Sequence, residues 1–140
     1  MNEGGSEPLI LVFSTNTISD PGIDFTGLMH LHYPTRTVIV RLPCSSMVRP
    51  QFVLYALTHG FDGVFIAADG PDCPYLAAAC VDITSQRMAE AQNLLKENGI
   101  KPERLAMAGI CSVCAEPFVR SIKAFYDRIK DLGKVEIGEV

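Results

Sequence analysis

The stretch GVFIAADGPDC, residues 63–73, decides the fold class. Its first six residues are uncharged and mostly apolar, and they stop at the turn residues DGPD. Three further runs have a similar form: LILVF (9–13), TVIVRL (37–42) and LAMAGI (105–110). Short, nearly continuous apolar runs are typical of strands that are buried on both faces of a parallel sheet.

Helical patterns lie between these runs. Residues 50–60 start with a proline and end at a glycine, and residues 116–133 form an amphipathic pattern with one apolar face. A long helix is predicted within 75–98 and a short one within 24–34, closed by Pro34. This alternation predicts a single α/β domain, an open parallel sheet of about four or five strands flanked by helices, flavodoxin-like in type.

Length and composition define the outline of the molecule. The 140 residues are predicted to form one domain over 9–133, with a flexible N-terminal tail at 1–8 and a C-terminal tail at 134–140. A net charge of -4 argues against a nucleic-acid partner. No apolar run reaches the about 18 residues of a membrane span, and the N-terminus lacks the features of a signal peptide. We therefore expect a cytoplasmic protein.

The chain has five cysteines, an odd number that disfavours a disulfide framework and favours metal binding or redox chemistry. In a parallel sheet all strands end at the same edge, where ligands bind. Cys44 follows the second predicted strand, Cys73 the third, and Cys111 and Cys114 the fourth. Cys80 falls inside the long helix and is interpreted as packing. Four thiols at one edge predict an iron–sulfur cluster or a structural zinc.

Other side chains near these positions have two interpretations each. His30 and His32 are possible ligands, but a solvated or capping role is the preferred interpretation. Asp69 fits a turn and is a minor candidate for an oxygen ligand. Ser45 and Ser46 either donate hydrogen bonds to sulfur or cap the helix that follows. Farther along, Lys101, Glu103 and Arg104 are predicted to form an exposed connection.

Three stretches carry a family resemblance that extends over residues 9–133: CSSMVRPQFVLYAL (44–57), FDGVFIAADGPDCPY (61–75) and NLLKENGIKPERLAM (93–107). They resemble the delta (iron–sulfur) subunit of methyl-viologen-reducing hydrogenase. The resemblance implies a 2Fe–2S cluster that relays electrons between an oxidoreductase, of hydrogenase or formate dehydrogenase type, and a heterodisulfide-reductase-like flavoprotein.

The cysteine pattern departs from that family. The first loop, where cysteines are expected, is STNTI (14–18), and Asp69 occupies another cysteine position, while Cys44 and Cys73 are kept. Cys111 and Cys114 are additional, in ICSVCAEPF (110–118). The resulting hypothesis is a relocated 2Fe–2S cluster held by Cys44, Cys73, Cys111 and Cys114.

Three alternatives remain open from the sequence. The same four cysteines suit a structural zinc, and a metal-free chain would serve to dock the other members of the complex. Cys111 and Cys114 would also suit a reversible dithiol, because a helix is predicted to start just after them. No nucleophile–base pair or phosphate-binding loop is present, so we expect a non-catalytic component of an oxidoreductase complex.

Overall fold

One parallel sheet organises the molecule. The structure is a computed structural model that describes residues 7–16, 18–33, 36–70, 73–111, 114–136 and 138. Within these residues the sheet has four strands in the order β3-β2-β4-β5. The strands are β2 (Ile10–Thr15), β3 (Thr37–Leu42), β4 (Gly63–Ala68) and β5 (Leu105–Gly109). The order matches the first four strands of flavodoxin-like folds, which confirms the predicted α/β class.

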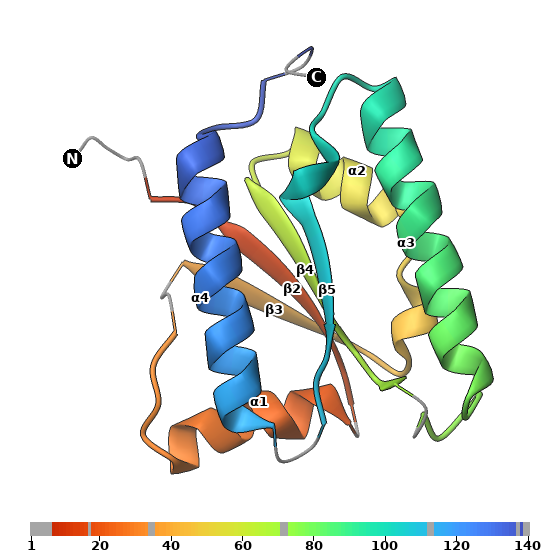
Figure 1. Cartoon of the computed structure of the whole chain (residues 1–140), viewed down its shortest axis with the longest axis vertical. Coiled ribbons are helices and arrows are strands. Elements are labelled where there is room, and N and C mark those ends of the chain that lie inside the picture. Colours follow the sequence, from red (N-terminus) through yellow and green to blue (C-terminus); the bar gives the residue numbers. More distant parts are fainter. Residues whose placement is uncertain are drawn as a thin grey trace.

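Helices cover both faces of the sheet (Figure 1). One face carries α1 (Ser19–Leu28) and α4 (Ala115–Leu132), and the other carries α2 (Pro50–Thr58) and α3 (Ala79–Glu97). Two short 3-10 helices, η1 (Ser45–Met47) and η3 (Pro102–Arg104), follow β3 and precede β5. The loops that leave the carboxyl ends of the strands gather at the lower end of the view in Figure 1.

The two faces bury separate apolar cores. On the α2/α3 face, Leu11, Val53 and Leu95 belong to one cluster of buried side chains. On the α1/α4 face, Phe65 and Phe118 belong to another, and their rings make a T-shaped, edge-to-face contact. The central strands β2 and β4 are therefore buried on both sides, as their continuous apolar sequences predict.

The edge strand β3 is less covered than its sequence suggests. The side chains of Val38 and Val40 remain 43% and 40% exposed. Among the described residues β3 pairs with β2 alone, so no further strand covers its outer edge. A run of β-branched residues indicates a strand, but it does not distinguish a central strand from an edge strand.

The short helix expected within 24–34 is displaced toward the N-terminus. α1 begins at Ser19, whose hydroxyl accepts a 2.7 Å hydrogen bond from the Thr15 amide. Ser14 donates its hydroxyl hydrogen to Asp20, in the first turn of α1. These local bonds start a helix inside a segment that resembles a turn. Pro34, the predicted end of the helix, lies outside the described residues.

Arg104 corrects another expectation, because its side chain is buried rather than exposed. The guanidinium donates hydrogen bonds to the carbonyls of Asp62 (3.0 Å), Gly133 (2.9 Å) and Lys134 (3.1 Å). It therefore joins the start of β5 to the end of α4. A planar group with five donors suits such a set of carbonyls.

Most of the predicted N-terminal tail, residues 1–6, lies outside the described part of the chain, as do residues 137, 139 and 140 of the predicted C-terminal tail. The described parts of both segments contact the fold. Glu7 accepts a hydrogen bond from Tyr126, and the Lys134 ammonium lies 3.1 Å from the Asp62 carboxylate. None of the described helices combines the length and the apolar character needed to cross a bilayer.

Candidate metal centre

Three thiols meet at the carboxyl edge of the sheet. Cys44 follows β3, Cys73 lies in the loop after β4, and Cys80 lies in the first turn of α3. The Cys44 sulfur is 3.2 Å from the Cys73 sulfur and 3.4 Å from the Cys80 sulfur. All three side chains are at most 3% exposed, and they form a small buried cluster separate from the two main cores.

Asp69 completes this group. It follows β4 directly, is buried, and offers a carboxylate oxygen within 4.8 Å of the three sulfurs. Its Oδ1 accepts a hydrogen bond from the Thr15 hydroxyl, whereas Oδ2 has no hydrogen-bond partner among the described residues. A buried carboxylate oxygen without a partner is costly, and a bound cation would remove that cost.

Hydroxyl groups surround the sulfurs. Ser46 Oγ lies 3.1 Å from the Cys44 sulfur, and Ser45 Oγ and Thr84 Oγ1 lie 3.5 and 3.6 Å from the Cys80 sulfur. Arg87 donates a 2.7 Å hydrogen bond to the Ser46 carbonyl and so fixes η1 against α3. Of the two roles considered for the serines, contact with sulfur is therefore observed. The N-cap of α2 is Arg49, which makes no side-chain capping bond.

The thiols differ in acidity. Burial raises the pKa of Cys44 to about 12; hydrogen bonds with Cys73 and Cys80 add to this effect, and Ser46 opposes it. Burial also acts to raise the pKa of Cys80, but hydrogen bonds with Ser45, Thr84 and the other two thiols outweigh it, so that pKa is lowered. The metal-free site therefore favours a negative charge on Cys80 over Cys44.

The structure brings together two of the four predicted ligands. Cys44 and Cys73 lie in the group, whereas Cys111 and Cys114 are joined to each other by a disulfide at the start of α4. Cys114 packs against the core of the α1/α4 face. The set Cys44, Cys73, Cys111 and Cys114 stays a prediction. Cys80 is buried, as its interpretation as a packing residue requires, but its sulfur also borders that of Cys44.

A turn between Cys73 and Cys80 brings about this contact, which the sequence pattern did not predict. α3 starts at Ala79 rather than near residue 75, and Ala77 adopts a positive φ of 48° in the preceding turn. The chain therefore folds back and places Cys80 beside the strand ends. The spacing Cys-x6-Cys in CPYLAAAC (73–80) was the available signal.

The other sequence candidates do not join the group. His30 and His32 are exposed beyond the end of α1, and His30 has a positive φ of 57°. Among the described residues, the group of Cys44, Cys73, Cys80 and Asp69 is the one whose ligand atoms converge as a metal requires. Three sulfurs and one carboxylate oxygen provide four donors, with soft thiolates in the majority, as iron–sulfur and zinc sites prefer.

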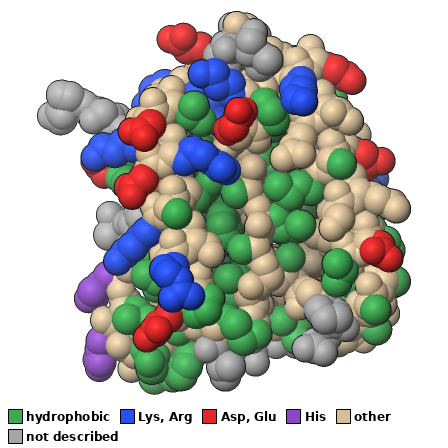
Figure 2. Space-filling view, viewed as in Figure 1, with side chains coloured by type: hydrophobic (Ala, Val, Ile, Leu, Met, Phe, Trp, Pro, Cys, Tyr) green, Lys and Arg blue, Asp and Glu red, His purple; other side chains and the backbone are tan. Residues whose placement is uncertain are grey.

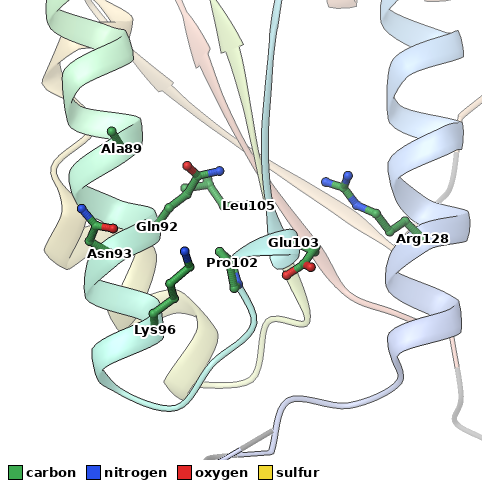
Figure 3. A pocket seen from close by; sticks show the side chains of 8 residues that line it. All are labelled: Ala89, Gln92, Asn93, Lys96, Pro102, Glu103, Leu105 and Arg128. Atoms are coloured by element: carbon green, nitrogen blue, oxygen red, sulfur yellow. The ribbon is translucent and has the colours of Figure 1, made fainter. Parts of the chain in front are cut away.

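The surface has hollows away from this site. Hydrophobic side chains line the surface groove that lies between α3 and α4, over β5 (Figure 2). A cavity of about 340 Å³ lies at the opposite, amino end of β5. It is bordered by Lys96 of α3, Glu103 of η3 and Arg128 of α4 (Figure 3). No cysteine lines this cavity, whereas the candidate metal ligands lie at the carboxyl edge of the sheet.

A parallel α/β fold with buried thiols at its carboxyl edge defines a class of small, candidate metal-binding proteins. Sequence comparison identifies the group within that class. The family model described as methyl-viologen-reducing hydrogenase, delta subunit, matches residues 10–133, and the chain belongs to this family.

Individual relatives agree with this assignment. The chain is 34% identical to the vhc iron-sulfur subunit of the F420-non-reducing hydrogenase of Methanococcus voltae, over 95% of this chain and 92% of the relative. It is 32% identical to the iron-sulfur subunit of the F420-non-reducing hydrogenase of Archaeoglobus profundus, over 91% and 92%. Both relatives are named as iron-sulfur subunits of hydrogenases.

A second kind of relative is much longer. One subunit of the ferredoxin:CoB-CoM heterodisulfide reductase of Methanosarcina mazei is 33% identical over 129 residues, which is 91% of this chain and 16% of that protein. The chain therefore spans about one sixth of the length of this relative and most of the length of the hydrogenase subunits.

Proposed function

We propose that this protein is an electron-transfer subunit of a multi-subunit redox complex. Electrons would pass through an iron–sulfur cluster, of 2Fe–2S type, between an oxidoreductase and a heterodisulfide-reductase-like flavoprotein in the cytoplasm. The oxidoreductase would be of hydrogenase or formate dehydrogenase type. The observation that carries the proposal is the convergence of Cys44, Cys73, Cys80 and a carboxylate oxygen of the buried Asp69 at one point.

In this proposal the four residues hold the cluster, and Asp69 takes the place of a cysteine. An iron–sulfur cluster supplies reversible one-electron transfer when it is bound. The chain sets the conditions for that chemistry. Burial keeps water from the sulfurs, and hydrogen bonds from Ser45, Ser46 and Thr84 stabilise negative charge on them, which raises a reduction potential.

The position of the site suits exchange with a partner. It lies at an edge of the sheet rather than in its centre, and a cavity of about 130 Å³ beside it is lined by Ser45, Gly70 and Thr84. The same family unit aligns with part of a much longer heterodisulfide reductase protein, which supports such a protein as a partner.

Anaerobic purification with iron, zinc and sulfide analysis tests the proposal. Iron near two atoms per chain, with a visible absorption that dithionite bleaches and an EPR signal in the reduced state, is the expected result. A chain that binds no iron, even after reconstitution with iron and sulfide, contradicts it.

A structural zinc is a second candidate, and the compactness of the site favours it. Metal–sulfur bonds of about 2.3 Å at tetrahedral angles separate two sulfurs by about 3.8 Å. The observed separations of 3.2 and 3.4 Å need only a small expansion to accept one ion. One zinc per chain, with no redox-active chromophore, would favour this function over the relay.

A metal-free docking role is a third candidate, and an apolar groove favours it. Val38 and Val40 of β3, together with Phe52 and Tyr55 of α2, line a groove of about 490 Å³. These four side chains are 40–65% exposed. Exposed apolar patches of this kind commonly mark protein interaction sites. Normal assembly of the complex by a variant that binds no metal would support this function.

A further inference from the structure

We propose that Cys111 and Cys114 form a redox-active disulfide that exchanges with a protein dithiol, independently of the metal centre. The two residues are bonded to each other directly before α4. This activity goes beyond the relay proposed above, which uses Cys44, Cys73 and Cys80. It assigns a reaction to the two cysteines that the buried thiol group leaves out.

Cys111 and Cys114 differ in their exposure to solvent. Cys111 is exposed, while Cys114 is partly buried and packs against the α1/α4 core. An incoming thiolate therefore reaches Cys111 more easily than Cys114. Thiol–disulfide exchange depends strongly on which sulfur is accessible.

The start of α4 favours Cys114 as the leaving group. Cys114 is the N-cap residue of a helix of 18 residues, and the N-terminus of a helix stabilises negative charge. Thiolates at such positions have a lowered pKa and leave more readily. The one acidic residue in the first turn, Glu116, is exposed, so solvent screens its opposing charge.

Buried residues flank the pair in the sequence on both sides. Ile110 is 1% exposed and donates a 3.0 Å hydrogen bond to the Ala68 carbonyl, and Ala115 is 2% exposed. On the α1 side, Gly22 leaves no space for a side chain, because a Cβ there would clash with the Cys111 carbonyl oxygen. Because of these contacts, we expect α4 to keep its position when the bond opens.

The proposed exchange balances as follows. A thiolate of the partner dithiol attacks the Cys111 sulfur, a mixed disulfide forms, and Cys114 leaves as a thiolate that takes up a proton. The second thiol of the partner, once deprotonated, attacks the mixed disulfide and releases Cys111. Two electrons and two protons pass to Cys111 and Cys114, and the partner dithiol becomes a disulfide.

A redox titration of the full-length, metal-loaded protein tests the proposal. The protein is equilibrated in buffers of reduced and oxidised dithiothreitol, quenched in acid, and its thiols are alkylated and counted by intact mass. We expect Cys111 and Cys114 to interconvert as a pair with unchanged circular dichroism. A bond that opens only in denaturant, or that oxidised dithiothreitol does not form in the folded protein, overturns the proposal.

Trapping the mixed disulfide tests the asymmetry. After brief reaction of the oxidised wild-type protein with reduced glutathione and an acid quench, we expect at least about tenfold more glutathione on Cys111 than on Cys114 by peptide mass, because the thiolate attacks the exposed residue and Cys114 leaves. Equal labelling of the two cysteines overturns the assignment of roles. Iron is measured in the single variants Cys111→Ser and Cys114→Ser: loss of iron in both variants, but not in the wild type, makes these cysteines metal ligands and also overturns the proposal. Absence of iron in all samples contradicts the relay but leaves the exchange reaction supported by its own titration.

Discussion

The sulfur atoms of Cys44 and Cys73 lie 3.2 Å apart, although 29 positions separate the two residues in the sequence. Cys44 follows β3 and Cys73 follows β4, and β2 lies between these strands in the sheet. The contact therefore depends on the parallel arrangement of three strands whose carboxyl ends share one edge. It brings thiols from distant segments into one buried group.

The first prediction concerns which cysteines bind iron. Cys80→Ser removes a sulfur that borders Cys44, so we expect most of the iron and visible absorption to be lost. Cys111→Ser is the matched control and keeps both, because its partner Cys114 lies against the other core. Iron content per chain is the measurement, and the reverse pattern would favour the ligand set Cys44, Cys73, Cys111 and Cys114.

Asp69→Asn is expected to weaken metal binding by about tenfold or more, since a neutral amide replaces a buried carboxylate whose Oδ2 has no partner among the described residues. Competition with a chelator of known affinity measures the change. Asp82→Asn, on the exposed side of α3, is the control with the same charge change. Equal metal affinity of the two variants would exclude Asp69 as a ligand.

A third prediction tests the contact between α1 and the loop after β5. Gly22→Ala introduces a Cβ against the Cys111 carbonyl and the Ile110 side chain, so we expect destabilisation by about 1–3 kcal/mol. Gly27→Ala in the same helix meets no atom within 4 Å and is expected to stabilise the protein by about 0.5–1 kcal/mol. Urea unfolding measures both, and the same sign for the two variants would contradict the packing described.

Arg104→Lys should lower the free energy of unfolding by about 2–4 kcal/mol, because lysine cannot serve the carbonyls of Asp62, Gly133 and Lys134 together. Thermal and chemical unfolding provide the measurement. Arg120→Lys, on the exposed surface of α4, controls for the residue change and is expected to have little effect. A stability of Arg104→Lys equal to that of the control would show that the carbonyl contacts contribute little.

The apolar groove gives a fifth prediction. Val40→Lys places a charge on the exposed face of β3 and is expected to reduce binding to a heterodisulfide-reductase-like partner at least about tenfold, without loss of iron. Val40→Thr keeps the branched shape and serves as the control. Binding measured by calorimetry that does not change in Val40→Lys would exclude this groove as the docking surface.

The sequence predicted the strands well because each central strand is buried on both faces, which requires a continuous apolar run. It misplaced α1 because its first residues, Ser19 to Gly22, have the composition of a turn. Hydrogen bonds of Ser19 and Asp20 with the end of β2 convert that segment into a helix start. Such contacts depend on the folded neighbour and leave little trace in local sequence.

The same distinction applies to the candidate site. Topology predicts that Cys44 and Cys73 reach one edge, and the structure agrees. Topology does not predict on which face of the sheet each thiol lies. Cys114 packs on the α1/α4 side, whereas the turn at Ala77 brings Cys80 into the buried group with Cys44 and Cys73. The strand order therefore gives the edge, and the conformations of the loops decide which thiols meet.

The position of bound metal tests the central claim most directly. Crystals of the anaerobically purified protein, measured on both sides of the iron absorption edge, give the location of iron by anomalous scattering. We predict an iron peak between the sulfurs of Cys44, Cys73 and Cys80 and beside Asp69. Iron at Cys111 and Cys114, or no iron in a protein reconstituted under the same conditions, would contradict the account.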